Sequence, residues 1–117
     1  MNIRTDPTRY HARVLVIHRF RVPADVAAEF AVVAGAAADH FRSRAGLAGV
    51  DLVRNLDDPQ LWALVSRWDD PGSYRRAIGG AAATYALMPV MAYALDEPSA
   101  YLPADELGEN VPRGQVG

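Results

Sequence analysis

The sequence predicts a single α+β domain in which an antiparallel sheet is covered by helices on one face. Segments 13–22 and 61–68 are rich in β-branched and large apolar residues, which is typical of strands. Segment 23–44 repeats apolar residues every three or four positions, as an amphipathic helix does. The length of 117 residues suits one domain with a real core, but not two.

Composition excludes several classes of function. The net charge is −2, so the chain lacks the broad cationic surface that nucleic acid requires. It contains no cysteine, which excludes disulfides, thiolate metal ligands and a cysteine nucleophile. No three ligands fall at a recognised metal spacing, and no phosphate-binding glycine loop occurs. The start of the sequence lacks the apolar region of a signal peptide, so a cytoplasmic location is expected.

The first strand, 13–22, alternates two sets of side chains. Both of its faces carry large apolar residues and are expected to be covered. The helix-facing set is Val14, Val16, His18, Phe20 and Val22, and the opposite set is Leu15, Ile17, Arg19 and Arg21. The helix 23–44 follows and ends before Gly46, with an apolar stripe of Val26, Phe30, Val33, Ala34, Ala37 and Phe41.

A hairpin of strands 50–54 and 61–68 comes next, because the turn-forming residues NLDDPQ lie between them. In this hairpin Trp62 can lie across from Arg54 in a cation–π contact. Asp70 is expected to cap a short helix that begins at Pro71 and ends near Ile78.

The last third is predicted as a helix and a short strand. Gly79 and Gly80 break the short helix, and a further helical piece runs from about 84 to 95. Although 77–95 carries no charge, its Gly, Pro, Thr and Tyr residues favour a buried helix over a membrane span. A strand is expected over 98–102. Residues 1–12 are predicted to be a flexible leader and 103–117 a mobile tail or an arm that reaches a partner.

A short internal repeat, 17–23 against 65–71, supports the element order βαββαβ, which is ferredoxin-like. It predicts that the first and third strands are neighbours, with Phe20 beside Trp68 under the helices and His18 beside Ser66. Arg19 and Arg67 are then neighbours on the other face and need a carboxylate, for which Asp51 is a candidate. That face also carries Leu15, Ile17, Ala63 and Val65, an apolar patch that predicts a homodimer.

The chain resembles the antibiotic biosynthesis monooxygenase-like family of the dimeric α+β barrel superfamily, over about residues 13–102. The resemblance is carried by VLVIHRFRVP (14–23), RNLDDPQLWALVSRWDDPGSYRRAI (54–78) and ALDEPSAYL (94–102). It implies a cavity between sheet and helices in which a phenolic, polyketide-type substrate gives an electron to dioxygen without metal or flavin. Heme-degrading relatives have asparagine and histidine where this chain has His18 and Ile78, so no heme is expected.

His18, Trp68, Asn55 and Tyr74 are the predicted catalytic residues: a base, a stacking wall and two hydrogen-bonding groups. Each also has a structural interpretation, such as a buried histidine bonded to Ser66, or a turn-forming asparagine. Further residues are predicted to bind substrate: Phe20, Trp62, Ser66, Tyr85, Met88 and Met91. The leading hypothesis is a cofactor-free monooxygenase that acts on a hydrophobic aromatic substrate with O₂. The alternatives are a non-catalytic ligand-binding or structural dimer, and a cyclase or isomerase using the same cavity.

Overall fold

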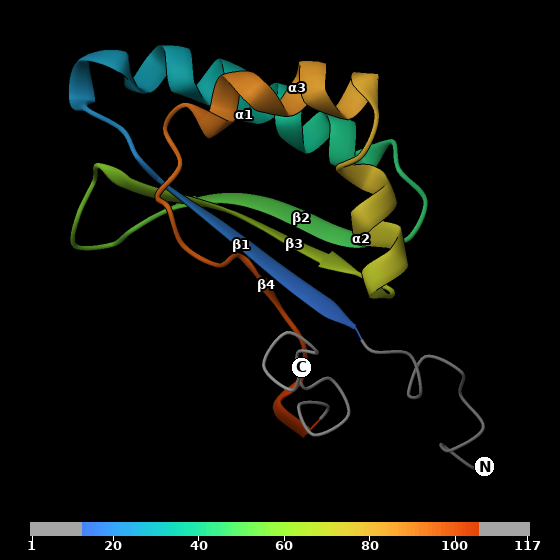
Figure 1. Ribbon diagram of the computed structural model, residues 1–117. Helices are drawn as coiled ribbons and strands as arrows, with labels where there is room; N and C mark the ends of the chain where they lie inside the picture. Colours follow the sequence, from blue (N-terminus) through green and yellow to red (C-terminus); the bar gives the residue numbers. More distant parts are fainter. Residues whose placement is uncertain (1–12, 106–117) are drawn as a thin grey trace.

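The computed structural model describes residues 13–105, which form a four-stranded antiparallel sheet with helices on one face (Figure 1). The strand order is β2-β3-β1-β4, the order of a ferredoxin-like fold. The predicted α+β fold class and element order are therefore confirmed. The predicted leader and most of the predicted tail, residues 106–117, lie outside the described residues.

The first half of the domain is β1 (Val14–Arg21), α1 (Ala27–Arg42) and β2 (Leu47–Arg54). In β1 the expected alternation is observed, with Val14, Val16 and Phe20 buried under the helices. The regular helix begins at Ala27 rather than Pro23, because the three residues Ala24–Val26 form a 3-10 turn first. Its buried stripe is close to the predicted one: Phe30, Ala34, Ala37, Ala38 and Phe41.

Gly46 makes the turn between α1 and β2 possible. Its φ is +93°, a conformation that side chains with a Cβ rarely adopt. A Cβ at this position would also lie 2.2 Å from the Ser73 hydroxyl oxygen, far inside van der Waals contact. The close approach locks the start of the second helical segment against the end of the first.

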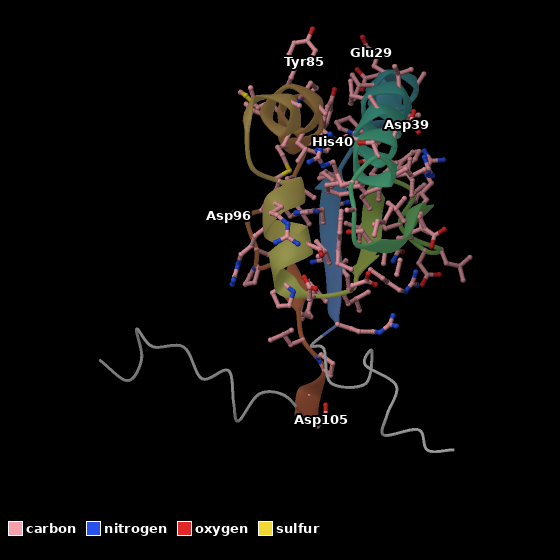
Figure 2. All side chains as sticks on the ribbon, turned by 90° about the vertical axis from the view of Figure 1, so that its right-hand side faces the viewer. Glu29, Asp39, His40, Tyr85, Asp96 and Asp105 are labelled. Atoms are coloured by element: carbon pink, nitrogen blue, oxygen red, sulfur yellow. The ribbon has the colours of Figure 1, made fainter. Side chains whose placement is uncertain are left out.

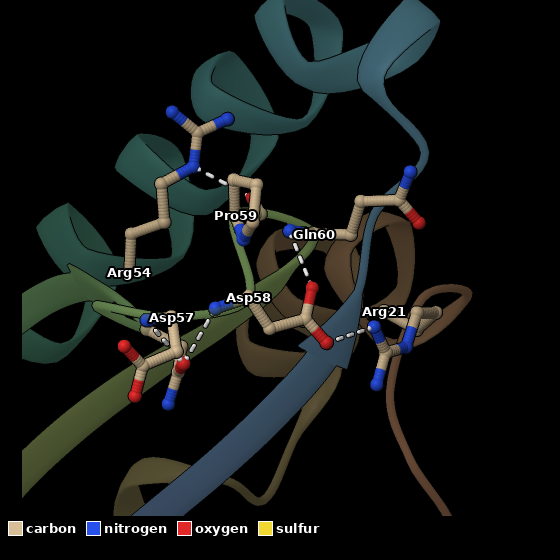
Figure 3. A network of polar contacts seen from close by, with 7 residues as sticks. Arg21, Arg54, Asp57, Asp58, Pro59 and Gln60 are labelled. Atoms are coloured by element: carbon tan, nitrogen blue, oxygen red, sulfur yellow. Dashed lines mark hydrogen bonds and ion pairs between the residues drawn. The ribbon is translucent and has the colours of Figure 1, made fainter.

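The hairpin is confirmed, with β3 spanning Leu61–Trp68. Its loop is held by side chains (Figure 3): the Asn55 carboxamide oxygen accepts from the amides of Asp57 and Asp58 at 2.9 and 2.8 Å. The Asp58 carboxylate in turn accepts from Arg21 of β1 at 2.7 Å and from the Gln60 amide at 3.0 Å. These contacts fix the register of the hairpin and tie its loop to the sheet.

The second half continues with α2 (Pro71–Ala77) and α3 (Ala81–Met91). As predicted, the Asp70 carboxylate caps α2, accepting from the Ser73 amide at 2.7 Å. The predicted third helix is present, but its bounds differ from the expected 84–95. It begins three residues earlier, directly after Gly80, and ends at Met91. Gly80 has φ +90°, and nothing among the described residues lies within 4 Å of a Cβ built there.

The last strand, β4, contains only Ala100–Tyr101. The chain before it nevertheless follows β1, with the Arg21 amide bonded to the Tyr93 carbonyl at 3.0 Å and the Ile17 amide to the Ser99 carbonyl at 2.7 Å. Irregular backbone therefore replaces much of the predicted strand 98–102 at this edge. Among residues 13–105, no helix is long and apolar enough to cross a membrane.

Two aromatic clusters fill the space between sheet and helices. Phe30 of α1 is at the centre of the first, with ring centroids 5.2 Å from each of three neighbours: Phe20, Trp62 and Tyr93. The second joins Trp68 to Phe41 at 5.3 Å and to Tyr74 at 5.9 Å. Such tilted and edge-to-face pairs are favourable arrangements of aromatic rings.

The register of β1 and β3 corrects one prediction from the internal repeat. The strands are adjacent but antiparallel, so Phe20 pairs with Trp62, and Trp68 pairs with Val14 at the other end. The prediction that Phe20 lies beside Trp68, and Arg19 beside Arg67, is therefore wrong, although each pair shares a face. Equivalent positions of two antiparallel copies lie at opposite ends of the pair.

The sheet face opposite the helices carries ion pairs and apolar side chains. Arg19 forms a bidentate salt bridge with Glu97, with nitrogen–oxygen distances of 2.6 and 2.7 Å. The carboxylate of Asp51 lies 3.6 Å from the guanidinium of Arg67, as predicted. Leu15 and Val53 remain 37% and 44% exposed. No described helix covers this face (Figure 1).

Candidate functional site

A cavity of about 200 Å³ lies between the sheet and the helices. Strands β1 and β3 form its floor, and α1 contributes one side. The other side is formed by α2, by Ile78 directly after it, and by α3. Its lining is almost entirely apolar: His18, Phe20, Phe41, Leu64, Tyr74, Ile78, Leu87, Val90 and Met91. The imidazole of His18 and the phenol of Tyr74 are therefore the polar groups available to a ligand in this cavity.

His18 lies in the middle of β1, opposite Leu64 of β3. The side chain points to the helix-covered face, because the strand alternation places Val16 and Phe20 on that face too. Burial lowers the pKa of His18 below its usual 6.5, since desolvation disfavours the charged imidazolium. The imidazole is therefore neutral at pH 7, the form that can accept a proton.

No described side chain or backbone group hydrogen-bonds to the His18 ring. The predicted structural alternative, a bond to Ser66, is not formed: His18 pairs with Leu64 in the sheet, and Ser66 pairs with Val16. The Ser66 hydroxyl accepts instead from the indole nitrogen of Trp68 at 2.9 Å. A half-buried imidazole with open hydrogen-bonding capacity in an apolar cavity is a typical feature of a ligand site.

Tyr74 reaches the cavity from α2. It is 8% exposed, and burial raises the pKa of its phenol, while a side-chain hydrogen bond with Ser99 acts in the opposite direction. The phenol is therefore neutral at physiological pH and can donate or accept a hydrogen bond. His18 and Tyr74 are the two predicted catalytic residues that the fold brings to one cavity.

Trp68 does not face this cavity as a free stacking surface. It is fully buried, its ring packs against Phe41 and Tyr74, and its indole nitrogen is bonded to Ser66. The predicted role as a stacking wall is therefore unavailable to Trp68 in this arrangement. Trp68 instead holds the ring of Tyr74 in place from behind.

Asn55 lies in the hairpin loop, where its side-chain oxygen already accepts hydrogen bonds from two backbone amides. It is exposed and does not line the cavity, so the structure supports the turn-forming interpretation. Trp62 packs on Phe30 and carries the Arg54 guanidinium 4.3 Å above its ring, which confirms the predicted cation–π contact. Its indole nitrogen is buried and has no hydrogen-bond partner within residues 13–105, a feature for which we find no physical reason.

The remaining predicted residues divide between two surfaces. Phe20 and Met91 line the cavity. Tyr85 and Met88 are 88% and 66% exposed and line an open groove on the outer side of α1 and α3. Figure 2 shows Tyr85 pointing out of the helical layer, away from the sheet. The helical periodicity used in the prediction cannot tell which side of α3 faces the sheet.

Five apolar lining residues were not predicted as site residues: Phe41, Leu64, Ile78, Leu87 and Val90 line the cavity beside the expected groups. Their periodicity marks them only as core, because a cavity wall and a packed core have the same apolar pattern. Among residues 13–105, no group of three or more His, Asp or Glu side chains could hold a metal ion.

The fold and the cavity define a ferredoxin-like α+β domain with a small apolar cavity under its helices. The model of the antibiotic biosynthesis monooxygenase family matches residues 13–82, which is more than half of the chain. The chain belongs to this family.

Solved structures share the fold at low sequence identity. One is SnoaB, a cofactor-independent oxygenase from Streptomyces nogalater, with 23% identity and a TM-score of 0.68, covering 77% of this chain and 91% of SnoaB. Rv0793 from Mycobacterium tuberculosis has 18% identity and a TM-score of 0.64, covering 80% and 94%. A conserved protein from Methanosarcina mazei Go1 has 14% identity and a TM-score of 0.67, covering 79% and 91%. No curated protein sequence matches the chain significantly.

Proposed function

We propose that this protein is a cofactor-independent monooxygenase that oxidises a small, uncharged phenolic aromatic compound with His18 as its base. The observation that carries the proposal is the unpaired, neutral imidazole of His18 in an otherwise apolar cavity. Membership of the family and the shared fold with the oxygenase SnoaB support the same reaction class. Tyr74 would serve as the second polar contact to the substrate oxygen.

The cavity volume narrows the substrate class. About 200 Å³ is below the roughly 300–1,000 Å³ of pockets that hold drug-sized ligands. One or two fused rings suit this volume better than the three or more rings of a typical polyketide. The absence of any charged side chain from the lining favours a neutral substrate, because a buried unpaired charge is costly.

With 1-naphthol as the model substrate, the proposed reaction consumes O₂ and forms 1,4-naphthoquinone and water. His18 takes the phenolic proton, and the resulting anion gives one electron to O₂. The radical and superoxide combine at the ring carbon opposite the oxygen. The hydroperoxide then loses water, with one proton returned from His18, and leaves 1,4-naphthoquinone. One oxygen atom of O₂ enters the product and the other leaves as water.

The site is proposed to work in a homodimer. The sheet face that no described helix covers carries partly exposed apolar residues, including Leu15, Ile17 and Val65. Packing two such faces together would remove this apolar surface from water. Light scattering on the purified protein should give twice the chain mass, and Val65→Glu should shift the mass to that of one chain.

The central experiment measures O₂ consumption and naphthoquinone formation with 1-naphthol. We expect His18→Ala to reduce kcat by about 10²–10⁴-fold, the usual contribution of a general base. Arg42→Ala, an exposed change on the outer side of α1, serves as the control and should leave kcat unchanged. Full turnover by His18→Ala would overturn the assignment of the base.

A second candidate, a non-catalytic protein that binds a small aromatic ligand, is favoured by the small cavity volume. It predicts that wild-type protein binds 1-naphthol without consuming O₂. Turnover of a substrate under strictly anaerobic conditions would instead indicate the cyclase or isomerase alternative.

A further inference from the structure

His40 makes a contact that the sequence does not suggest. At the sequence level it belongs to the polar side of α1, where a residue is expected to face solvent. In the structure it is half-buried, and its Nε2 lies 2.8 Å from the carbonyl oxygen of Ala77, the last residue of α2. Figure 2 shows His40 on the side of α1 that faces α2 and α3, whereas the neighbouring Asp39 lies on the side that faces away from them.

The carbonyl of Ala77 needs this partner. The last carbonyls of a helix have no donor within the helix, and Ala77 itself is 1% exposed. The described backbone hydrogen bonds at this helix end go to Tyr74 and Arg76, and none reaches the Ala77 oxygen. Nε2 of His40 therefore donates to an acceptor that would otherwise be buried and unsatisfied, which stabilises the contact.

Ala77 packs in the hydrophobic core, but among the described residues the His40 contact is the hydrogen bond that joins this end of α2 to another element. The start of the helix is fixed by the Asp70 cap and by the close approach of Gly46 to Ser73. The other end runs into Gly79 and Gly80, where Gly80 has a positive φ and open space around it. A short helix fixed at one end and followed by two glycines can tilt unless the second end is held.

The held end carries the cavity-lining residue Ile78, which lies one helical turn after Tyr74 on the same side of α2. Ile78 directly follows the carbonyl that His40 binds. We propose that His40 is a positioning residue, which clamps the end of α2 to α1 and so sets the distance of the Ile78 side chain from His18. Its effect on turnover rests on the proposed function, whereas its effect on α2 does not.

The first test uses the free protein and needs no substrate. His40→Leu and His40→Asn remove the donor, because the asparagine amide is too short to reach the position of Nε2. His40→Gln keeps a donor at the same number of bonds from Cα. We expect amide hydrogen exchange at Ile78 and Gly79 to become about tenfold faster in the two loss variants, with near wild-type rates in His40→Gln. Arg42→Leu is the control: Arg42 lies on the same helical turn but pairs with exposed Asp39, so the exchange rates at Ile78 and Gly79 should stay at their wild-type values.

The second test measures the site with 1-naphthol as the probe. The dissociation constant of 1-naphthol should rise several-fold in His40→Leu and His40→Asn and recover in His40→Gln. If the protein turns over 1-naphthol, kcat should fall in parallel in the loss variants, because the substrate is held less well against His18.

The outcomes separate the two proposals. Unchanged exchange at Ile78 in both loss variants would show that His40 does not clamp α2. Faster exchange with unchanged naphthol affinity would show that the clamp is structural and positions nothing at the site. If wild-type protein consumes no O₂, the oxygenase proposal fails, while the exchange and binding results still decide the role of His40.

Discussion

The two halves of the domain use the same strand–helix–strand plan but differ in how firmly the helical segment is held. In the first half, the 16 residues of α1 cover the sheet with one continuous buried stripe. In the second half, the helical segment is divided into α2 and α3, of 7 and 11 residues, with a glycine break between them. The first half supplies most of the core, and the second half closes the cavity.

The glycines at the helix ends show the same difference. Gly46 and Gly80 both have a positive φ, but Gly46 is packed against Ser73 and Gly80 has open space around it. A tightly packed helix end and a loose one therefore occur at related places in the two halves.

The largest expected effect comes from the core of the first half. Phe30→Ala removes a fully buried ring that contacts three other aromatic rings, so the free energy of unfolding should fall by about 3–5 kcal/mol. Urea unfolding followed by circular dichroism measures this. Leu87→Ala, which shortens a partly buried side chain of the cavity wall, is the matched comparison and should cost clearly less. An equal loss in both variants would contradict the larger contribution of the first half to the core.

The glycine pair should give an intermediate effect. Gly80→Ala introduces only backbone strain and should cost about 1–2 kcal/mol. Gly46→Ala adds a steric overlap with Ser73 to the same strain, so it should cost more. Truncating the neighbour in the double variant Gly46→Ala/Ser73→Gly should recover part of the loss, which thermal unfolding can detect. A larger loss at Gly80 would mean that the α2–α3 break is the more constrained of the two.

The smallest effect is a pH dependence that comes from His18. Because burial lowers the pKa of folded His18 below 6.5, the unfolded state binds more protons there as the pH falls. The contribution to stability is therefore complete above pH 6.5 and is lost as the pH falls towards the folded pKa. The slope from one group is at most about 1.4 kcal/mol per pH unit.

Replacing the imidazole isolates this contribution. His18→Leu should remove the acid-dependent loss between pH 6.5 and 5 in urea unfolding, relative to wild type. In the proposed reaction, kcat/KM should likewise fall on the acid side with a midpoint below 6.5, because only the neutral imidazole accepts the proton. Parallel stability curves for wild type and His18→Leu would contradict the lowered pKa.

Much of the fold could be predicted from local patterns. The alternation in β1, the stripe in α1, the hairpin and the Asp70 cap each depend on residues that are close together in the sequence. The details of the second half could not be predicted as well. Short helices, glycine breaks and a two-residue strand have too few residues for their periodicity to define them.

The candidate site was predictable only in part, for a related reason. The strand pattern of β1 placed His18 and Phe20 on the cavity face, since alternation along one strand is a local property. Asn55 and Trp68 were assigned to the site by residue type and resemblance. Their partners, two loop amides and Ser66, emerged only with the folded hairpin and strand.

By itself, the sequence determined the element order, the apolar faces and the position of His18 on the helix-covered face of its strand, because these follow from spacing along the chain. Only the tertiary structure decided the antiparallel register that separates Phe20 from Trp68, the outward position of Tyr85 and the contact of His40 with Ala77. Each of these depends on how segments distant in sequence are placed against one another. Burial and packing decide that placement, and it cannot be predicted from local periodicity.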